Sequence, residues 1–254
     1  MKRALRAEWS KTWSDPATVW LLAGLVVVTV AVSAGTTAAA RCPAAGCGQD
    51  PAKLSLTGVY LGQVVAVVIG VLAIGTEYRT GMIRVTLAAM PRRLVLLAGK
   101  ILVLAGPLLI TSAVTVAVCQ LIGRIVLPGH GFTSAHGAEV WSAGDWRASF
   151  CTMAYVVLIA VFSLGIATVV RDTAAAAGVV LGALFLLPVL ASAVTDPLRR
   201  HLEQISPLLA GQDMQATTGL TGLPLAPWPA LGVVACWAAG GLLLGGLALR
   251  LRDA

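Results

Sequence analysis

Six stretches of the chain contain no Asp, Glu, Lys, Arg or His, and each is long enough to cross a membrane. A helix needs about 20 apolar residues to span the hydrocarbon core of a bilayer. The stretches are apolar on every side and lack the period-two alternation of a barrel strand. The sequence therefore predicts an all-α integral membrane protein, with residues 1–254 forming a single membrane domain. The expected transmembrane helices lie near residues 16–40, 54–76, 101–123, 148–170, 173–195 and 230–249. The alternative for the third is a longer helix that begins near Leu94 and contains Lys100, whose ammonium reaches the membrane surface.

The composition excludes an ordinary soluble domain. Charged residues make up 11% of the chain, apolar residues make up 58%, and the mean hydropathy is +0.88. A soluble domain has about 25% charged residues. The net charge is nevertheless +7, a balance that often indicates nucleic-acid binding, so the position of the charge decides its meaning.

The short loops give the orientation, because Lys and Arg concentrate on the cytoplasmic side of a membrane. With the N-terminus in the cytoplasm, 12 of the 18 basic residues and 5 of the 11 acidic residues lie in inside segments. The whole excess of +7 then faces the cytoplasm, and the outer segments are neutral. We therefore expect a multi-pass protein of the plasma membrane with both termini in the cytoplasm. The basic charge needs no nucleic-acid partner.

The N-terminal segment, residues 1–14, is predicted to be an amphipathic helix that lies on the inner surface of the bilayer. Leu5, Trp9 and Trp13 recur every four residues and form one apolar face, with basic residues around the rest. Such a helix binds an anionic leaflet through both faces. It serves either as a tether alone or also as a contact for a cytoplasmic partner, and the sequence leaves both open.

The longest and most basic cytoplasmic loop follows the second predicted span. Gly81 can end the helix that leaves this span, and Pro91 stops a short helix on which Ile83 and Leu87 share one face. The basic side chains of the segment are candidates for contact with acidic partners: Arg79, Arg84, Arg92 and Arg93. The charge pattern by itself is equally consistent with a role in membrane insertion alone.

No enzyme motif is present. The chain lacks an HExxH pair, a Gly-x-Ser-x-Gly elbow and a phosphate-binding loop, and the six charge-free stretches contain no proton relay. His130 and His136 have no carboxylate or thiol cluster near them in the sequence, so no metal site is expected. We therefore expect no catalytic, cofactor or metal site in this chain, and a source of energy outside it for any transport.

The cysteines divide by location. Cys119, Cys151 and Cys236 fall in predicted spans, where a thiol packs as a small apolar group. Cys42 and Cys47 fall in the first outer loop, where an oxidising compartment permits a disulfide. The sequence leaves open whether these two are bonded.

The stretch from Glu77 to Lys100 resembles the cytoplasmic coupling segment of type-2 ATP-binding-cassette (ABC) transporter permeases, especially small bacterial ones. Their pattern is Glu-x-x-x-Gly-Thr, a Thr-Leu or Leu-Leu pair, Pro-x-Arg or Pro-Arg-Arg, and a Lys at the third span. The matching positions, in order, are Glu77, Gly81, Thr86, Leu87, Pro91, Arg92, Arg93 and Lys100. Met82 stands where the family usually has Thr.

The resemblance implies that residues 77–93 form a coupling helix that docks on a separate ATPase subunit. Two ATPase copies, which would bind ATP and Mg²⁺, would drive a dimer of permease chains, either identical or different. Export of a hydrophobic or amphipathic small molecule is the implied activity. The coupling contact would be made by Glu77, Tyr78, Arg79, Gly81, Ile83, Arg84, Leu87, Pro91, Arg92 and Arg93.

The outer connection at residues 196–229 is too apolar for a solvated loop and is interrupted by several prolines. The resemblance implies short re-entrant or interfacial helices there, and the residues alone are also consistent with a loosely packed cap. A different class of function stays open for the whole chain. It is a non-transporting membrane scaffold or immunity-type factor that holds a cytoplasmic partner.

Overall fold

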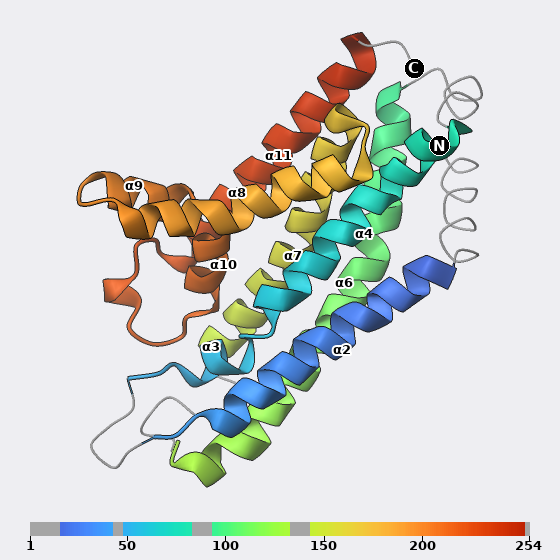
Figure 1. The fold of residues 1–254 in the computed structure, drawn as a ribbon. Helices are drawn as coiled ribbons and strands as arrows, with labels where there is room; N and C mark the ends of the chain where they lie inside the picture. The colour runs from blue at the N-terminus through green and yellow to red at the C-terminus, as the bar shows by residue number, and fades with distance from the viewer. Residues whose placement is uncertain (1–15, 43–47, 83–92, 133–142, 252–254) are drawn as a thin grey trace.

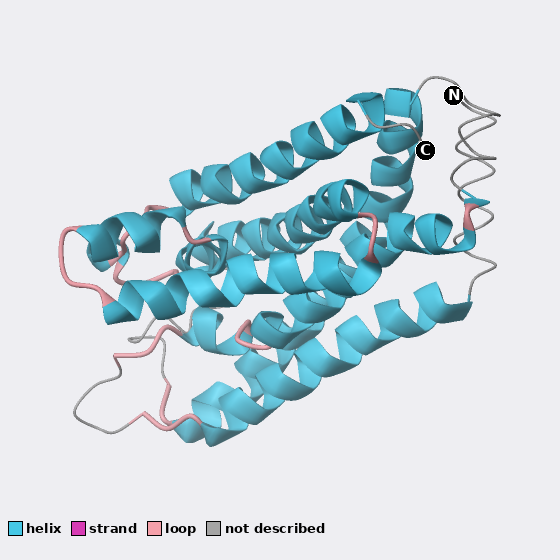
Figure 2. Cartoon of the chain, turned by 45° about the horizontal axis from the view of Figure 1, so that its top comes forward, coloured by secondary structure: helices cyan, strands magenta, loops and turns pink. Residues whose placement is uncertain are grey.

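The computed structural model describes residues 16–42, 48–82, 93–132 and 143–251, and within these ranges the chain is helical with no strand (Figure 2). Six helices are long and apolar enough to cross a membrane, which confirms the predicted all-α, six-span membrane fold. They are α2 (Pro16–Ala39), α4 (Val59–Thr80), α6 (Arg93–Val126), α7 (Ala143–Val170), α8 (Thr173–Ala193) and α11 (Pro227–Leu251). The predicted N-terminal interfacial helix lies outside the described residues.

The long helices run alternately in opposite directions, so Pro16 and Leu251 lie at the same end of the bundle (Figure 1). We call this the Glu77 end, because α4 finishes there, and the opposite end the Asp50 end. The shorter elements gather at the Asp50 end. They are α3 (Pro51–Ser55), η1 (Leu127–His130), α9 (Leu198–Ile205), α10 (Pro207–Gln215) and η3 (Leu220–Gly222).

The two most buried long helices, α4 and α7, form the centre of the bundle, and α7 also packs along α11. Small residues allow this packing because apolar helices in a membrane associate by close contact rather than by exclusion of water. A Cβ built on Gly70 of α4 would lie 2.2 Å from the carbonyl oxygen of Ala160 in α7. Glycine at position 70 therefore sets the distance between the two central helices.

A second glycine contact joins α7 to α11. A Cβ on Gly165 would lie 2.4 Å from the carbonyl carbon of Gly241, and Gly245 faces the carbonyl oxygen of Gly165. The sequence pattern of paired glycines in the last span indicated a close helix contact, either within the chain or across a dimer. The structure places Gly241 and Gly245 in a contact within the chain.

The helices differ from the charge-free stretches at their ends. The second span begins at Val59 rather than near residue 54, because Asp50 starts the separate helix α3 and its side chain caps the amides of Ala52 and Lys53. At the Glu77 end of the bundle, α4 ends later and α6 begins earlier than the corresponding charge-free stretches. They thereby bring Glu77 and Lys100 into helices classed as membrane spans.

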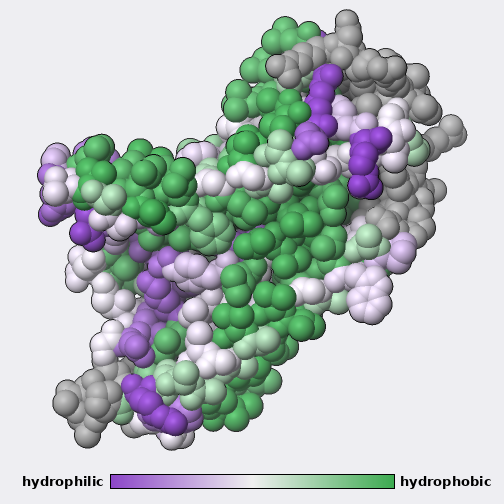
Figure 3. Space-filling model, viewed as in Figure 1, coloured by the Kyte–Doolittle hydropathy of each residue, from purple (hydrophilic) through white to green (hydrophobic). Residues whose placement is uncertain are grey.

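The outward faces of the peripheral helices are apolar (Figure 3). On α6 the exposed side chains include Leu102, Ile110, Val114 and Leu121, and α8 and α11 present similar leucine- and valine-rich faces. These faces suit contact with lipid chains. Hydrophilic residues lie at both ends of the bundle in this view, and the apolar surface lies between them (Figure 3).

Candidate functional site

A buried ion pair lies at the Glu77 end of the bundle. The ammonium of Lys100 is 2.9 Å from a carboxylate oxygen of Glu77, and the side chains are 3% and 2% exposed. Lys100 also donates a hydrogen bond of 3.1 Å to the carbonyl oxygen of Ala73, one turn earlier in α4. The pair thus fixes the last turns of α4 to the first turns of α6.

The local sequence explains this geometry. Gly81 adopts a left-handed conformation (φ 70°) and its N–H bonds to the carbonyl of Tyr78, which ends α4 one turn beyond Glu77. Helix α6 begins at Arg93, so Lys100 is already two turns inside it. Two opposite charges buried together cost far less than either alone, because each offsets the desolvation of the other.

The neighbouring residue Tyr78 connects the same turn of α4 to α7. Its hydroxyl donates a hydrogen bond of 3.5 Å to the carbonyl of Thr168, and the Arg171 guanidinium lies 5.5 Å from the centre of its ring. Arg171 has a positive φ of 62°, and its N–H bonds to the carbonyl of Ala167 at the end of α7. The turn between α7 and α8 is therefore held against the end of α4.

Helix α8 begins at the same place. Asp172 accepts a hydrogen bond of 2.7 Å from the N–H of Ala175 and so caps the helix. A Cβ on Gly75 of α4 would lie 2.3 Å from the methyl group of Thr173, so the two helices touch closely. Four helices, α4, α6, α7 and α8, thus meet around Glu77 and Tyr78.

The structure describes part of the predicted coupling segment. Gly81 ends α4 as expected, Arg79 is exposed, and Arg93 is the first residue of α6. Glu77 differs from the expectation of an accessible loop residue, because it lies within α4 and is buried by its pairing with Lys100. The remaining members lie outside the described residues: Ile83, Arg84, Leu87, Pro91 and Arg92.

Two other groups of predicted residues are only partly described. Leu5, Trp9 and Trp13 of the interfacial helix lie outside the described residues. Cys42 is disulfide-bonded, and its expected partner Cys47 lies outside the described residues.

Sequence reasoning missed the pairing of Glu77 with Lys100. The signal that could have found it is the position of each residue. Glu77 directly follows the second charge-free stretch, and Lys100 directly precedes the third. Opposite charges at the same end of adjacent spans are well placed to pair, because a paired charge is less costly in a membrane.

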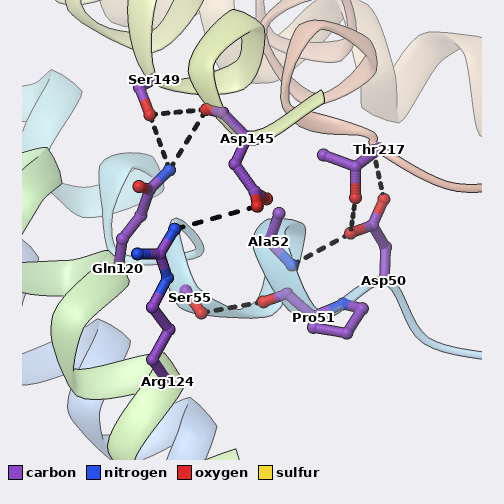
Figure 4. A network of polar contacts seen from close by, with 9 residues as sticks. All are labelled: Asp50, Pro51, Ala52, Ser55, Gln120, Arg124, Asp145, Ser149 and Thr217. Atoms are coloured by element: carbon purple, nitrogen blue, oxygen red, sulfur yellow. Dashed lines mark hydrogen bonds and ion pairs between the residues drawn. The ribbon is translucent and has the colours of Figure 1, made fainter. Parts of the chain in front are cut away.

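A polar network at the Asp50 end ties the outer segments together (Figure 4). The carboxylate of Asp50 caps α3 and also accepts hydrogen bonds from the N–H of Thr217, the Thr217 hydroxyl at 2.8 Å and the N–H of Thr218 at 2.9 Å. Arg147 at the start of α7 donates to the carbonyl of Ala216. The chain after α10 is thus held by both α3 and α7.

A second part of this network joins α6 to α7 (Figure 4). The Gln120 amide donates to the Ser149 hydroxyl at 2.7 Å and to the carbonyl of Asp145 at 3.4 Å. Arg124 lies 3.8 Å from the carboxylate of Asp145. The polar groups of Gln120, Arg124, Asp145 and Ser149 named here bond to one another, which is the pattern of a structural network.

Helix α10 carries a buried acid, Asp213, whose side chain belongs to neither network. Burial raises the pKa of Asp213 to about 6, against an ordinary value of 3.8, although the positive charge of Lys53 opposes the rise. One of its carboxylate oxygens has no hydrogen-bond partner among the described residues. No group of three or more His, Cys, Asp or Glu residues that could hold a metal ion occurs in the described part of the chain.

No protein-family model and no curated protein matches the chain.

Proposed function

We propose that this chain is the membrane permease subunit of an ATP-driven ABC transporter of the bacterial plasma membrane, with both termini in the cytoplasm. It works with a second permease chain and two copies of a separate ATPase subunit, and exports a hydrophobic or amphipathic small molecule. The six membrane-spanning helices and the pattern from Glu77 to Lys100 support the proposal.

One observation carries it most directly. The segment between α4 and α6 is the proposed docking element, and the Glu77–Lys100 pair bridges the two helices at its two ends. Elsewhere α4 and α6 touch little, because α4 packs mainly on α7 and α6 packs mainly on α2 and α7. A displacement of the segment by the ATPase would therefore move the ends of α4 and α6 together, because this pair joins them.

The contacts of Tyr78 extend the path. Through Thr168 and Arg171 the end of α4 is joined to the turn between α7 and α8. A displacement of α4 would be transmitted to both of these helices. This arrangement suits a chain that converts an external conformational change into movement of its membrane helices, because packed elements shift as units.

The first test is purification of the full chain in mild detergent from its native host. We expect a nucleotide-binding subunit to be recovered in a fixed ratio, with ATPase activity in the complex. Recovery of the chain without such a subunit under several mild conditions would contradict the proposal and favour the scaffold function.

The second test uses the ion pair. Glu77→Lys or Lys100→Glu alone should reduce ATP-dependent transport in vesicles more strongly than ATP hydrolysis, and the double exchange should restore part of the transport. Arg250→Gln is the matched control, because Arg250 is an exposed basic residue at the same end of the bundle, on α11. Full ATP-dependent transport by both single variants would contradict the coupling role.

A further inference from the structure

A small cavity lies between α4, α7 and α10, towards the Asp50 end. Its volume is about 10 Å³, which is room for one group the size of a water molecule. Five of its eight lining residues carry a polar side-chain group, although α4 and α7 are apolar membrane helices. The lining residues that matter here are Tyr60, Gln63, Tyr155, Leu208, Gln212 and Gln215.

The amide of Gln63 has an unused donor at this cavity. The hydroxyl of Tyr155 donates to the amide oxygen of Gln63, and this bond fixes the orientation of the amide. Its Nε2 has no hydrogen-bond partner among the described residues, although the side chain is only 1% exposed. Burial of an N–H group without an acceptor is unfavourable, so such a group is expected to serve a ligand or a water.

The packing of α10 keeps this space polar and small. Gly211 lies directly on the ring of Tyr155, where a Cβ would be 2.7 Å from a ring carbon. Tyr155 and Gln215 are buried, whereas Tyr60 and Gln212 are partly exposed. The cavity therefore has a closed inner side at Gln63 and an outer side towards Tyr60 and Gln212.

The lining also defines the charge of the occupant. The residues that line the cavity, all within the described part of the chain, carry no formal charge. A cation or an anion would have no counter-charge in contact with it, and its desolvation would be uncompensated. A neutral oxygen acceptor suits the cavity better than an ion does. It accepts a hydrogen bond from the Gln63 amide, and its desolvation costs far less free energy than that of a charged group.

We propose that this cavity is the polar end of a binding site for a neutral amphipathic molecule, and that it receives one carbonyl or hydroxyl oxygen as a hydrogen-bond acceptor from Gln63. The rest of the molecule lies outward, past Tyr60 and Gln212. Binding at this site does not require an ATPase partner. Only the identification of the occupant as transported cargo rests on the proposed function.

The test measures binding of 2-octanone, whose carbonyl oxygen accepts but does not donate, to the full chain in detergent. The stretch of the unlabelled ketone lies at a higher frequency than the protein amide band, and hydrogen bonding lowers its frequency. A difference spectrum against the ¹³C-carbonyl ketone assigns the band to the ligand. We expect a lowered band that saturates near one ketone per chain. At a fixed pH of 7, n-octylamine and octanoate should displace the bound ketone no better than n-octane does, as measured by the loss of the lowered band.

Variants assign the donor. Gln63→Leu and Gln63→Met both remove the amide but differ in shape, and each should abolish the lowered band and weaken ketone binding roughly fivefold or more. Gln120→Leu is the matched control, since Gln120 is also a buried glutamine in a span but already bonds to Ser149. The Gln120→Leu variant should keep the lowered ketone band. Helical content and thermal unfolding are measured for every variant.

Absence of a saturable lowered band in the wild-type chain, or its persistence in a folded Gln63 variant, would overturn the site. The outcome is separate from that of the proposed function. If the lowered band is observed but the chain is purified without an ATPase subunit, the binding site stands. Only the identification of its occupant as transported cargo is then contradicted.

Discussion

The carboxylate of Glu77 and the ammonium of Lys100 lie 2.9 Å apart, and both are almost fully buried where α4 and α6 approach each other. Removal of one charge leaves the other buried without compensation, at a cost of about 3–5 kcal/mol. We therefore expect Lys100→Met and Glu77→Gln each to lower the unfolding temperature of the chain in detergent markedly. The double variant should be much closer to the wild type than the sum of the single effects.

The control for this prediction is the exposed pair Arg200–Asp196, whose atoms are 3.6 Å apart and whose side chains are 75% and 62% exposed. Arg200→Gln should leave the unfolding temperature almost unchanged, because water screens exposed pairs. Additive effects in the Glu77 and Lys100 double variant would show that the two residues do not act as a pair.

Replacement of Gly165 by alanine should destabilise the contact between α7 and α11. The added Cβ would lie 2.4 Å from the Gly241 carbonyl carbon, so the helices must separate. Gly178→Ala in α8 is the matched change, because no atom lies within 4 Å of the Cβ position there. Thermal unfolding should show a clear loss for the first variant and none, or a small gain, for the second. Equal behaviour of the two would contradict the close contact.

The stability of the chain should depend on pH through Asp213. Burial raises the pKa of Asp213 to about 6 in the folded chain, so the folded state is disfavoured once this carboxylate ionises. The charge of Lys53 acts against this rise, whereas that of Glu203 adds to it. As the pH rises from about 4 to 6, the wild type should lose stability that Asp213→Asn retains.

Unfolding temperatures at pH 4 and pH 8 check this sign. The gain of Asp213→Asn over the wild type should be larger at pH 8 and should level off above pH 6. Asp196→Asn provides the comparison, since Asp196 is exposed in the same outer connection. A gain for Asp213→Asn that is the same at both pH values would exclude titration of this residue as the cause.

Loss of the Asp50 carboxylate should loosen the outer segments together. Asp50→Ala removes the cap of α3 and the acceptor for Thr217 and Thr218, so limited proteolysis should cut the chain after α10 faster. Thr217→Val removes only the 2.8 Å hydroxyl bond and should have a smaller effect on the same cleavage rate. Equal cleavage of the wild type and Asp50→Ala would contradict the joint anchoring.

The six membrane helices could be predicted from the sequence because each corresponds to a charge-free apolar stretch, a local property that needs no knowledge of neighbours. The end of α4 at Gly81 was equally accessible, since glycine favours the left-handed conformation that closes a helix. The start of α4 could not be predicted in this way. The helix begins at Val59, after the separate helix α3 that Asp50 caps.

The contacts between distant residues could not be predicted in this way. Tyr155 bonds to Gln63 across 92 residues, and this contact depends on how α4 packs against α7. Both residues look like ordinary polar positions in apolar stretches. Likewise, the burial of Glu77 and Lys100 depends on their meeting, a condition that exists only in the folded chain. The position of Lys100 inside a longer third helix could be predicted from the apolar residues that precede it.

The contact of Gly165 with Gly241 and Gly245 brings backbone against backbone. Side chains can adopt new rotamers when helices shift, but two backbones in direct contact have no such adjustment available. Helices α7 and α11 are therefore expected to move as one rigid body. Any change of shape in the membrane must then come from α2, α4, α6 and α8 moving relative to this pair.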